Sequence, residues 1–395
     1  MSRTDVLIIG AGAAGLSLAH RLAGPVPNGR TPSVLLVDAP PGPLRPAPRT
    51  WCFWESGRGR FDAAVRYQWR HLRVRPPVGP PVEGDIAPLR YKMIRSDDFE
   101  ALVGRALATS AHVRRLEAVV DAVVEVREGA LVSMTEPEGR EREVTARWVF
   151  DSRPLDRLPA ARTTLLQHFR GWFVRTARPV FDPRTAELMD FRTPQPSEGL
   201  SFGYVLPTAP DEALVEYTRF SRRVLTETEY ESELRHYTAE VLGLGPLEVV
   251  ATEHGVIPMT DAVLPRRTGA SVFRIGAAGG ATRPSTGYTF AGLQRQTRAV
   301  AAALRQGRPP VPPPAHSARS LAMDAVLLRA LDSGRLDGPE LFCRLFARVP
   351  AARLLRFLDG DTGLVEDIRV GRHAPARPMV RSALELPRLP RRPPA

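Results

Sequence analysis

The first forty residues alternate between unbroken apolar runs and helical spacing. Val6–Ile9 is a continuous apolar run, which is typical of a strand buried on both faces of a parallel sheet. Apolar residues then recur at Ala14, Leu18 and Leu22, along one face of a helix, and Val34–Val37 is a second apolar run. Strand, helix and strand in this order predict one βαβ unit and place the chain in the α/β class.

The remaining pattern is mixed. Residues 165–257 are mostly strand-like, and a proline-rich linker at 309–314 precedes helical spacing. We predict these further elements: a helix at 96–108, a hairpin from 119–126 and 131–135, strands at 148–150 and 273–275, and helices near 229–242, 321–331, 341–349 and 354–358.

Composition is that of a folded protein. Of 395 residues, 43% are hydrophobic and 25% are charged, and this length favours two or three lobes. Cys52 and Cys343 are far apart in the sequence and predict neither a disulfide framework nor a thiolate metal site, which fits a reducing cytoplasm. Because we find neither a signal-peptide pattern nor an apolar run long enough to span a bilayer, we expect a protein that is soluble or lies on a membrane surface.

The net charge of +12 comes almost entirely from arginine, since Lys92 is the only lysine. An arginine-rich proteome, attraction to an anionic membrane and nucleic-acid binding could each explain it. The arginines are scattered and no nucleic-acid motif occurs. We therefore favour the first two explanations and expect no nucleic-acid partner; the oligomeric state stays open.

The turn after the first predicted strand has the spacing GxGxxG. Gly10 permits a tight turn, Gly12 lets a phosphate approach bare backbone, and Gly15 lets the helix pack closely on the strand. Ala14 lies in the first turn of that helix, whose N–H groups attract a pyrophosphate. Asp38 ends the second strand, where a carboxylate can bind a ribose. A dinucleotide site is favoured over a turn that serves packing alone.

A second glycine-rich segment favours FAD over NAD. The chain leaves the regular βα pattern and returns far downstream to a strand followed by Gly276, Gly279 and Gly280. A two-headed cofactor needs such a second loop for its flavin half. Arg95, just before a predicted helix, could meet the cofactor phosphates or could be a solvated surface residue.

Several motifs, in the same order, run through residues 5 to 380. They are GAAGGATRPSTGYTF at 276–290, RTWCFW at 49–54, FDSRP at 150–154, LQHFRGW at 166–172, FDP at 181–183, LMDFR at 188–192 and EHGVIPMT at 253–260. On these motifs the chain resembles the flavin-dependent lycopene cyclases of carotenoid-making bacteria.

The resemblance implies a fold like that of flavoprotein hydroxylases and a reaction without net redox change. Reduced FAD would stabilise a carbocation formed when a proton is added to an end of lycopene; NADPH or NADH would reduce the flavin, and β rings are the family's default product. The resemblance also implies that Asp151, Pro284, Thr286, Gly287 and Tyr288 lie at the cofactor.

This reading divides the chain into a discontinuous FAD-binding domain, a substrate domain with a mixed sheet, a C-terminal helical region and a disordered tail. The FAD-binding domain comprises residues 1–60, 90–155 and 270–307, and the substrate domain comprises residues 61–89 and 156–269. The helical region spans residues 315–380, and the disordered tail spans residues 381–395.

A strand-borne glutamate is the leading candidate acid. Strand alternation puts Glu216 on one face with Leu214, Thr218 and Phe220. Its carboxyl group is therefore either buried, with a partner or a function, or solvated at the edge of a sheet. An alkene is a very weak base, and burial keeps a carboxyl group protonated. The position matches the family's acidic motif, in which a second acid commonly stands where this chain has Tyr217.

Other candidates are less specific. Glu253 is predicted to be a base or an orienting carboxylate, or else a loop-capping residue. Aromatic side chains could line a slot for a polyene or simply pack in the core, and the histidines lack metal-ligand spacing, so no metal is expected. The aromatic candidates are Trp51, Trp54, Phe169, Trp172, Phe191 and Tyr288.

Two other functions stay open: an FAD-dependent monooxygenase acting on an apolar isoprenoid, and a flavin- or carotenoid-binding protein without catalysis. Since lycopene dissolves in membranes, we expect a cytoplasmic protein that is peripheral on the inner face of the cell membrane. The C-terminal helices would form part of the contact surface.

Overall fold

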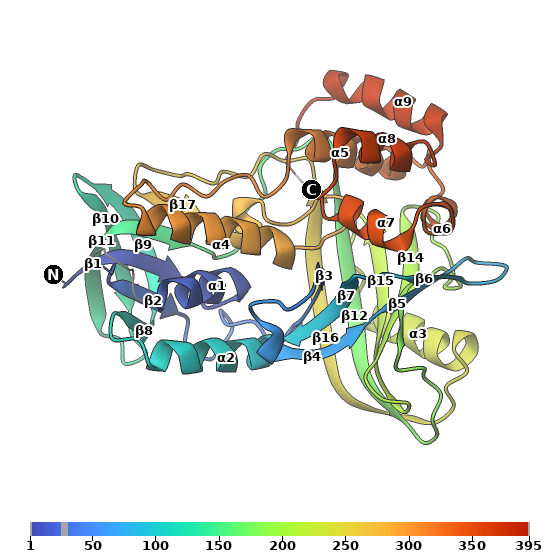
Figure 1. The fold of residues 1–395 in the computed structure, drawn as a ribbon, viewed down its shortest axis with the longest axis horizontal. Helices are drawn as coiled ribbons and strands as arrows, with labels where there is room; N and C mark the ends of the chain where they lie inside the picture. The colour runs from blue at the N-terminus through green and yellow to red at the C-terminus, as the bar shows by residue number, and fades with distance from the viewer. Residues whose placement is uncertain (1, 25–30, 394–395) are drawn as a thin grey trace.

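The computed structural model describes residues 2–24 and 31–393. A seven-stranded sheet contains the predicted βαβ unit, with β8, β2, β1, β11 and β17 parallel and the hairpin β9–β10 antiparallel (Figure 1). Its strands are β1 (Ser2–Ile9), β2 (Val34–Asp38), β8 (Val113–Glu117), β9 (Val119–Val126), β10 (Gly129–Thr135), β11 (Glu141–Asp151) and β17 (Val272–Arg274).

Both faces of this sheet are buried, as the unbroken apolar runs predict. Val6 and Ile8 pack toward three helices, α1 (Ala13–Leu22), α2 (Ser96–Ala108) and α4 (Phe290–Arg305). Leu7 and Ile9 point the other way and pack on residues of the hairpin β9–β10. The predicted bounds of α2 and the predicted position of the hairpin are confirmed.

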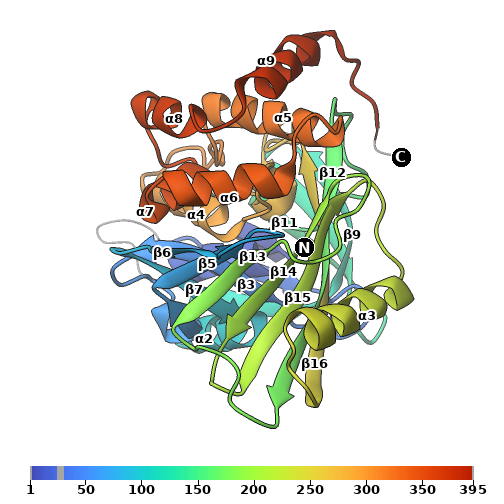
Figure 2. The ribbon, with the colours of Figure 1, turned by 90° about the vertical axis from the view of Figure 1, so that its right-hand side faces the viewer.

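A second seven-stranded sheet occupies the other half of the molecule (Figure 2). In spatial order its strands are β16 (Leu247–Thr260), β12 (Thr164–Thr176), β15 (Glu212–Ser221), β14 (Leu200–Pro207), β13 (Thr185–Asp190), β5 (His71–Arg75) and β6 (Val82–Asp85). One face packs on α3 (Glu227–His236), and the other faces the rest of the molecule. Every strand of this sheet falls within the segments assigned to the substrate domain, although that division stays a prediction.

A small third sheet lies between the two large ones (Figure 1). It consists of β3 (Thr50–Ser56), β7 (Leu89–Arg95) and β4 (Val65–Trp69), all antiparallel. Trp54 and Tyr91 from this sheet share a hydrophobic cluster with Leu214 and Phe220 of the second sheet. The two halves of the molecule are therefore joined by packed side chains.

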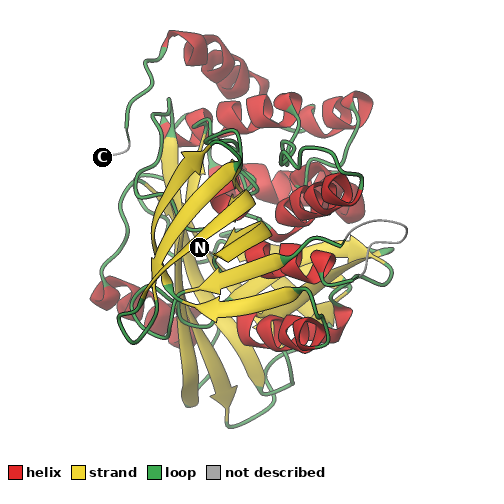
Figure 3. Ribbon diagram, turned by 90° about the vertical axis from the view of Figure 1, so that its left-hand side faces the viewer, coloured by secondary structure: helices red, strands yellow, loops and turns green. Residues whose placement is uncertain are grey.

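Five helices follow the proline-rich linker and cover one end of the second sheet (Figures 2 and 3). They are α5 (Ala318–Asp332), α6 (Gly338–Arg348), α7 (Ala351–Leu358), α8 (Leu364–Gly371) and α9 (Ala376–Glu385). No helix of residues 2–24 and 31–393 has the length and apolar character needed to cross a membrane.

The predicted disordered tail is wrong for most of its length. Helix α9 runs on to Glu385, whose carboxylate forms ion pairs with Arg329 and Arg335. Farther on, the backbone of Arg392 pairs with that of Ala161. These contacts order a segment that composition alone marks as low-complexity; residues 394–395 lie outside the described part.

Candidate functional site

The first glycine turn has the geometry that its spacing predicts. Gly10 has a φ of +92°, and a Cβ at Gly15 would lie 1.9 Å from the carbonyl oxygen of Gly10. Gly12, in contrast, faces open space, and no side chain caps the helix that begins after it. The first turn of α1 therefore presents unshielded backbone N–H groups, which is the arrangement that binds a phosphate.

Asp38 lies beside this turn. Its Oδ1 accepts a hydrogen bond from the backbone N–H of Ala11 at 3.0 Å, and its Oδ2 lies 3.3 Å from Arg115. The turn thus uses part of the hydrogen-bonding capacity of Asp38, and its contact with a ribose stays a prediction.

The second glycine turn packs directly on the first. Gly276 has a φ of +69°, and a Cβ there would lie 2.8 Å from the Cβ of Ala14. Gly279 leaves no room for a side chain, and Gly280 has a φ of +75°. The structure thus joins two segments that are more than 250 residues apart, as the FAD prediction requires.

A buried glutamine holds this second turn, and the sequence analysis missed it. Gln296 on α4 accepts from the N–H of Gly276 at 3.3 Å and donates to the carbonyl of Gly279 at 2.8 Å. Its side chain is fully buried. A single polar residue inside a helix gives no signal of its own, because its partners are set only by the tertiary fold.

Asp151 lies at the end of β11, beside the first glycine turn. Its carboxylate accepts hydrogen bonds from the backbone and side chain of Arg153, and its carbonyl accepts from the N–H of Ile275. The next residue, Ser152, donates to the carbonyl of Ile9 at 2.8 Å. Asp151 thus organises backbone where the ends of three strands meet.

The segment that carries Pro284, Thr286, Gly287 and Tyr288 is a tight loop pinned by a buried ion pair. Arg283, only 2% exposed, lies 2.7 Å from Asp324 on α5. The carbonyl of Arg283 accepts from the N–H groups of Thr286 and Gly287. This loop is therefore anchored to the C-terminal helices.

One buried acceptor at this loop has no partner in the described structure. Gly287 has a φ of +73°, and a Cβ there would lie 2.4 Å from Oε1 of Gln167. That oxygen is buried and accepts no hydrogen bond. This oxygen therefore has unused hydrogen-bonding capacity beside the loop.

Four residues line up across four neighbouring strands of the second sheet. Tyr204 on β14 pairs with Glu216 on β15, Glu216 pairs with Gly171 on β12, and Gly171 pairs with Glu253 on β16. Partners in register project to the same face of a sheet. Both candidate carboxyl groups are therefore on one face, separated only by a glycine.

Gly171 makes room for the two carboxyl groups to meet. A Cβ on this residue would lie 2.9 Å from Cγ of Glu216 and 3.3 Å from its Oε1. Glu216 and Glu253 are both buried. Burial, the charge of Glu253 and a hydrogen bond between the two groups raise the pKa of Glu216 well above its usual value. Glu216 therefore holds a proton that an exposed glutamate would have lost.

Glu253 is held from its other side by residues of the small sheet. Its Oε2 accepts hydrogen bonds from Oγ1 of Thr50 at 2.7 Å and from Arg95 at 2.9 Å. The Arg95 guanidinium lies 4.6 Å from the centre of the Phe173 ring. Arg95 is thus neither a solvated surface residue nor free of partners; it forms a nearly buried ion pair with Glu253. A contact between Arg95 and cofactor phosphates stays a prediction.

A cluster of neutral hydroxyl and thiol groups surrounds the face that bears Glu216. The Tyr91 hydroxyl hydrogen-bonds to that of Tyr204 and, at 2.8 Å, to that of Tyr288. Burial raises the pKa of Cys52, beside these tyrosines, to about 12. Trp54 lies edge-on to Tyr288 with ring centres 4.6 Å apart. The groups placed around Glu216 are therefore aromatic rings, hydroxyl groups and a thiol, together with Glu253 and Arg95.

Tyr217 points away from this cluster. It belongs to the opposite face of the sheet and packs with Tyr230 and Tyr237 under α3. Trp172 lies on that face as well. Alternation along β15 thus excludes residue 217 from Glu216's side, and the second carboxyl group there comes from Glu253. Within residues 2–24 and 31–393, no group of three or more His, Cys, Asp or Glu residues could hold a metal ion.

Comparison with known proteins identifies the family. The model of the family described as "Lycopene cyclase protein" matches residues 5–384. The chain belongs to this family. A lycopene beta-cyclase from a Paracoccus species is 26% identical over 409 residues, which cover 98% of each chain.

Solved structures define the fold class. The geranylgeranyl bacteriochlorophyll reductase-like protein of Thermoplasma acidophilum is 13% identical with a TM-score of 0.62, over 98% of this chain and 100% of the other. The p-nitrophenol 4-monooxygenase of Pseudomonas putida is 14% identical with a TM-score of 0.59, over 99% and 100%. The predicted α/β fold of the flavoprotein hydroxylases is confirmed.

Proposed function

We propose that this lycopene cyclase family member closes the linear ends of lycopene into β-ionone rings, giving γ- and then β-carotene, without net oxidation or reduction. The observation that supports the proposal is the buried Glu216–Glu253 pair, in which burial and the neighbouring carboxyl group raise the pKa of Glu216 on an apolar and aromatic face. Protonating an alkene needs such an acid, because an ionised carboxylate has no proton to give.

Glu216 is the proton donor in this proposal. Its proton goes to a terminal double bond of the substrate, the cation that results is attacked by a neighbouring double bond, and a ring forms. A different proton then leaves the ring carbon and returns to the Glu216 carboxylate. The acid is thereby regenerated, and the sum of atoms and electrons in the product equals that in the substrate.

Glu253 is the orienting carboxylate. Thr50 and Arg95 occupy its Oε2, so its other oxygen is left for Glu216 across Gly171. The Arg95 ion pair and the Thr50 hydrogen bond fix the orientation of the Glu253 carboxyl group beside Glu216. A cation would be stabilised here by the aromatic faces of Trp54 and Tyr288. The neutral hydroxyl groups beside these rings complete a site from which water is excluded.

FAD fits the two glycine turns. The uncapped first turn of α1 and the open face of Gly12 suit the pyrophosphate, and the buried oxygen of Gln167 at Gly287 can accept a hydrogen bond from another part of the cofactor. We assign the pyrophosphate to Gly10, Gly12, Ala14 and Gly15, and the ribose to Asp38. When bound and reduced, FAD supplies negative charge near the developing cation; NADPH or NADH serves as its reductant.

Lycopene presented under anaerobic reducing conditions tests the proposal. Purified protein is mixed with FAD, NADPH and lycopene in liposomes. The pigments are then separated by chromatography, and their molecular masses are measured by mass spectrometry. A ring-containing product of unchanged mass supports cyclisation. A product that has gained oxygen, or a strict need for O2, indicates a monooxygenase; unchanged lycopene that stays bound indicates a carrier.

The substrate also determines where the protein works. Lycopene is a hydrocarbon that dissolves in the bilayer, so the enzyme meets it at a membrane surface. We assign the protein to the cytoplasmic face of the cell membrane as a peripheral protein, with the liposome assay above as the first check.

A further inference from the structure

Helices α8 and α9 expose an unusual number of large aliphatic side chains. Among the other described helices only α5 exposes one, at Leu321. The exposed fractions on α8 and α9 lie between 56% and 63%, at Leu364, Val365, Ile368, Val380 and Leu384. Isolated apolar residues on a surface are ordinary, but two consecutive helices that expose five such side chains indicate a binding surface. Both helices lie at the same end of the molecule (Figures 1 and 2).

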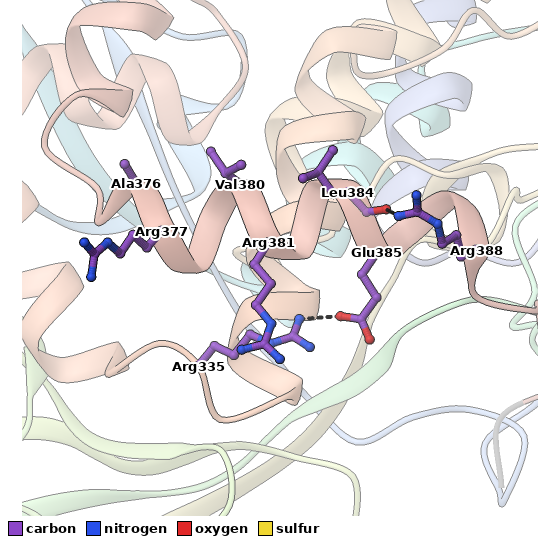
Figure 4. Close-up of a pocket in the computed structure, with 8 residues that line it drawn as sticks. All are labelled: Arg335, Ala376, Arg377, Val380, Arg381, Leu384, Glu385 and Arg388. Atoms are coloured by element: carbon purple, nitrogen blue, oxygen red, sulfur yellow. Dashed lines mark hydrogen bonds and ion pairs between the residues drawn. The ribbon is translucent and has the colours of Figure 1, made fainter.

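The sequence of α9 arranges these side chains in stripes. Ala376, Val380 and Leu384 are four residues apart and follow one edge of the helix, next to a second stripe that begins with Arg377 and Arg381 (Figure 4). The opposite side of α9 is buried through Ser382 and packs on α5. The exposed side of α9 thus carries an apolar stripe next to a stripe of arginines.

The charge on this surface is positive and unpaired. Five exposed arginines have no carboxylate partner within ion-pair distance in residues 2–24 and 31–393: Arg369, Arg372, Arg377, Arg381 and Arg388. The acids of the same segment are instead paired with arginines of other elements. Those pairs are Glu366 with Arg356, Asp367 with Arg319, and Glu385 with Arg329 and Arg335.

We propose that the exposed faces of α8 and α9 are the surface that docks on a bilayer containing anionic phospholipid. Aliphatic side chains next to unpaired arginines are the pattern of a helix that lies in the membrane interface, with its apolar side chains among the acyl chains and its arginines at the phosphates. A second copy of the chain fits less well, because a twofold contact would bring the arginines of the two copies face to face.

The same helices connect this surface to the proposed active site. Val370 on α8 belongs to one hydrophobic cluster with Leu214 of β15, and Met379 on α9 and Tyr288 pack against that cluster. Apolar packing therefore links the buried sides of α8 and α9 to the face that bears Glu216. The purpose assigned to docking, which is to deliver a membrane-dissolved polyene, rests on the proposed function.

Vesicle flotation tests the docking surface. The full-length protein is mixed with vesicles of phosphatidylcholine alone or with phosphatidylglycerol, at low and high salt. We expect binding to the anionic vesicles that weakens with salt. Arg377→Gln/Arg381→Gln should lower the partition coefficient on anionic vesicles roughly 25-fold, since each arginine near an anionic surface contributes about fivefold. Val380→Gln/Leu384→Gln should lower it at least about tenfold even at high salt.

Matched controls come from surfaces away from α8 and α9. Val124→Gln/Val126→Gln removes two exposed aliphatic side chains of β9, and Arg105→Gln/Arg114→Gln removes two exposed arginines. Both controls should float like the unmodified protein. Equal binding by all variants, or no preference for anionic vesicles, contradicts the proposal. So does a dimer in sedimentation that the α9 variants abolish while vesicle binding is unchanged.

Activity in detergent distinguishes a failure of the docking proposal from a failure of the proposed cyclase activity. With lycopene dispersed in micelles, the α9 variants should turn over at the unmodified rate, because docking is bypassed. Protein that binds anionic vesicles through α9 but cyclises no lycopene in either system leaves the docking surface intact and contradicts the proposed function.

Discussion

Gly171→Ala is the sharpest perturbation of the proposed acid pair. The new Cβ would lie 2.9 Å from Cγ of Glu216, 3.0 Å from Cδ1 of Leu214 and 3.3 Å from Oε1 of Glu216. Strand β12 is hydrogen-bonded on both sides, to β15 and β16, so the backbone has little freedom to retreat. The Glu216 side chain must move instead, and its hydrogen bond with Glu253 is lost.

The cost in stability should be small and the cost in rate large. Overpacking a core typically costs about 1–3 kcal/mol, and replacing a strand glycine by alanine returns about 0.5–1 kcal/mol. The net destabilisation is then between about 0 and 2.5 kcal/mol. A catalytic group displaced by about 1 Å loses on the order of 100-fold in rate. We therefore expect folded protein that binds FAD but cyclises lycopene about 100-fold more slowly.

The assay compares the rate of ring formation with FAD content from the absorption spectrum and with the thermal midpoint. Gly104→Ala is the matched control: Gly104 lies inside α2, and a Cβ there meets no atom within 4 Å. That variant should be as active as the parent and slightly more stable. Cyclisation by Gly171→Ala within about twofold of the parent, at equal FAD content, would refute the proposed meeting of the carboxyl groups across Gly171.

Four further predictions follow from the same site. Glu216→Gln should retain FAD and lose turnover, and normal cyclisation by this variant rules out Glu216 as the acid. Turnover should fall as pH rises through the elevated pKa of Glu216, because only the protonated carboxyl group donates; a profile that rises over this range contradicts the assignment. The parent should also lose stability relative to Glu216→Gln as pH rises from the ordinary glutamate pKa toward that elevated value, since ionising the buried group is unfavourable; thermal midpoints in a pH series measure this difference. Tyr217→Phe should turn over within about twofold of the parent, because the Tyr217 side chain lies on the opposite face of the sheet. A 100-fold loss of turnover in the same assay would contradict the exclusion of Tyr217 from the site.

Local features were predictable where the chemistry is local. The turn with Gly10 and Gly15 follows from three glycines between an apolar strand and a helix, and the structure has the expected backbone there. The burial of Glu216 follows from alternation with Leu214 and Phe220. In both cases the signal lies within one element, so the sequence carries it directly.

Features that depend on strand register were not predictable. The role of Gly171 arises because residues 45 and 82 positions away in sequence become its neighbours, and nothing near Gly171 indicates which residues those are. The ion pair of Arg95 is hidden from the sequence for the same reason, since its partner Glu253 is on another sheet. The order of residues 381–393 is likewise not predictable, because it comes from ion pairs and backbone contacts with distant residues.

Cyclisation in D2O with pre-reduced FAD and no oxygen tests the central claim most directly. If Glu216 donates a solvent-exchanged proton and takes back a different one, the product gains up to one deuterium per ring. The flavin absorbance should stay that of the reduced form throughout. Rings formed without deuterium, oxygen in the product, or reduced flavin consumed in proportion to product would contradict an acid–base cyclisation.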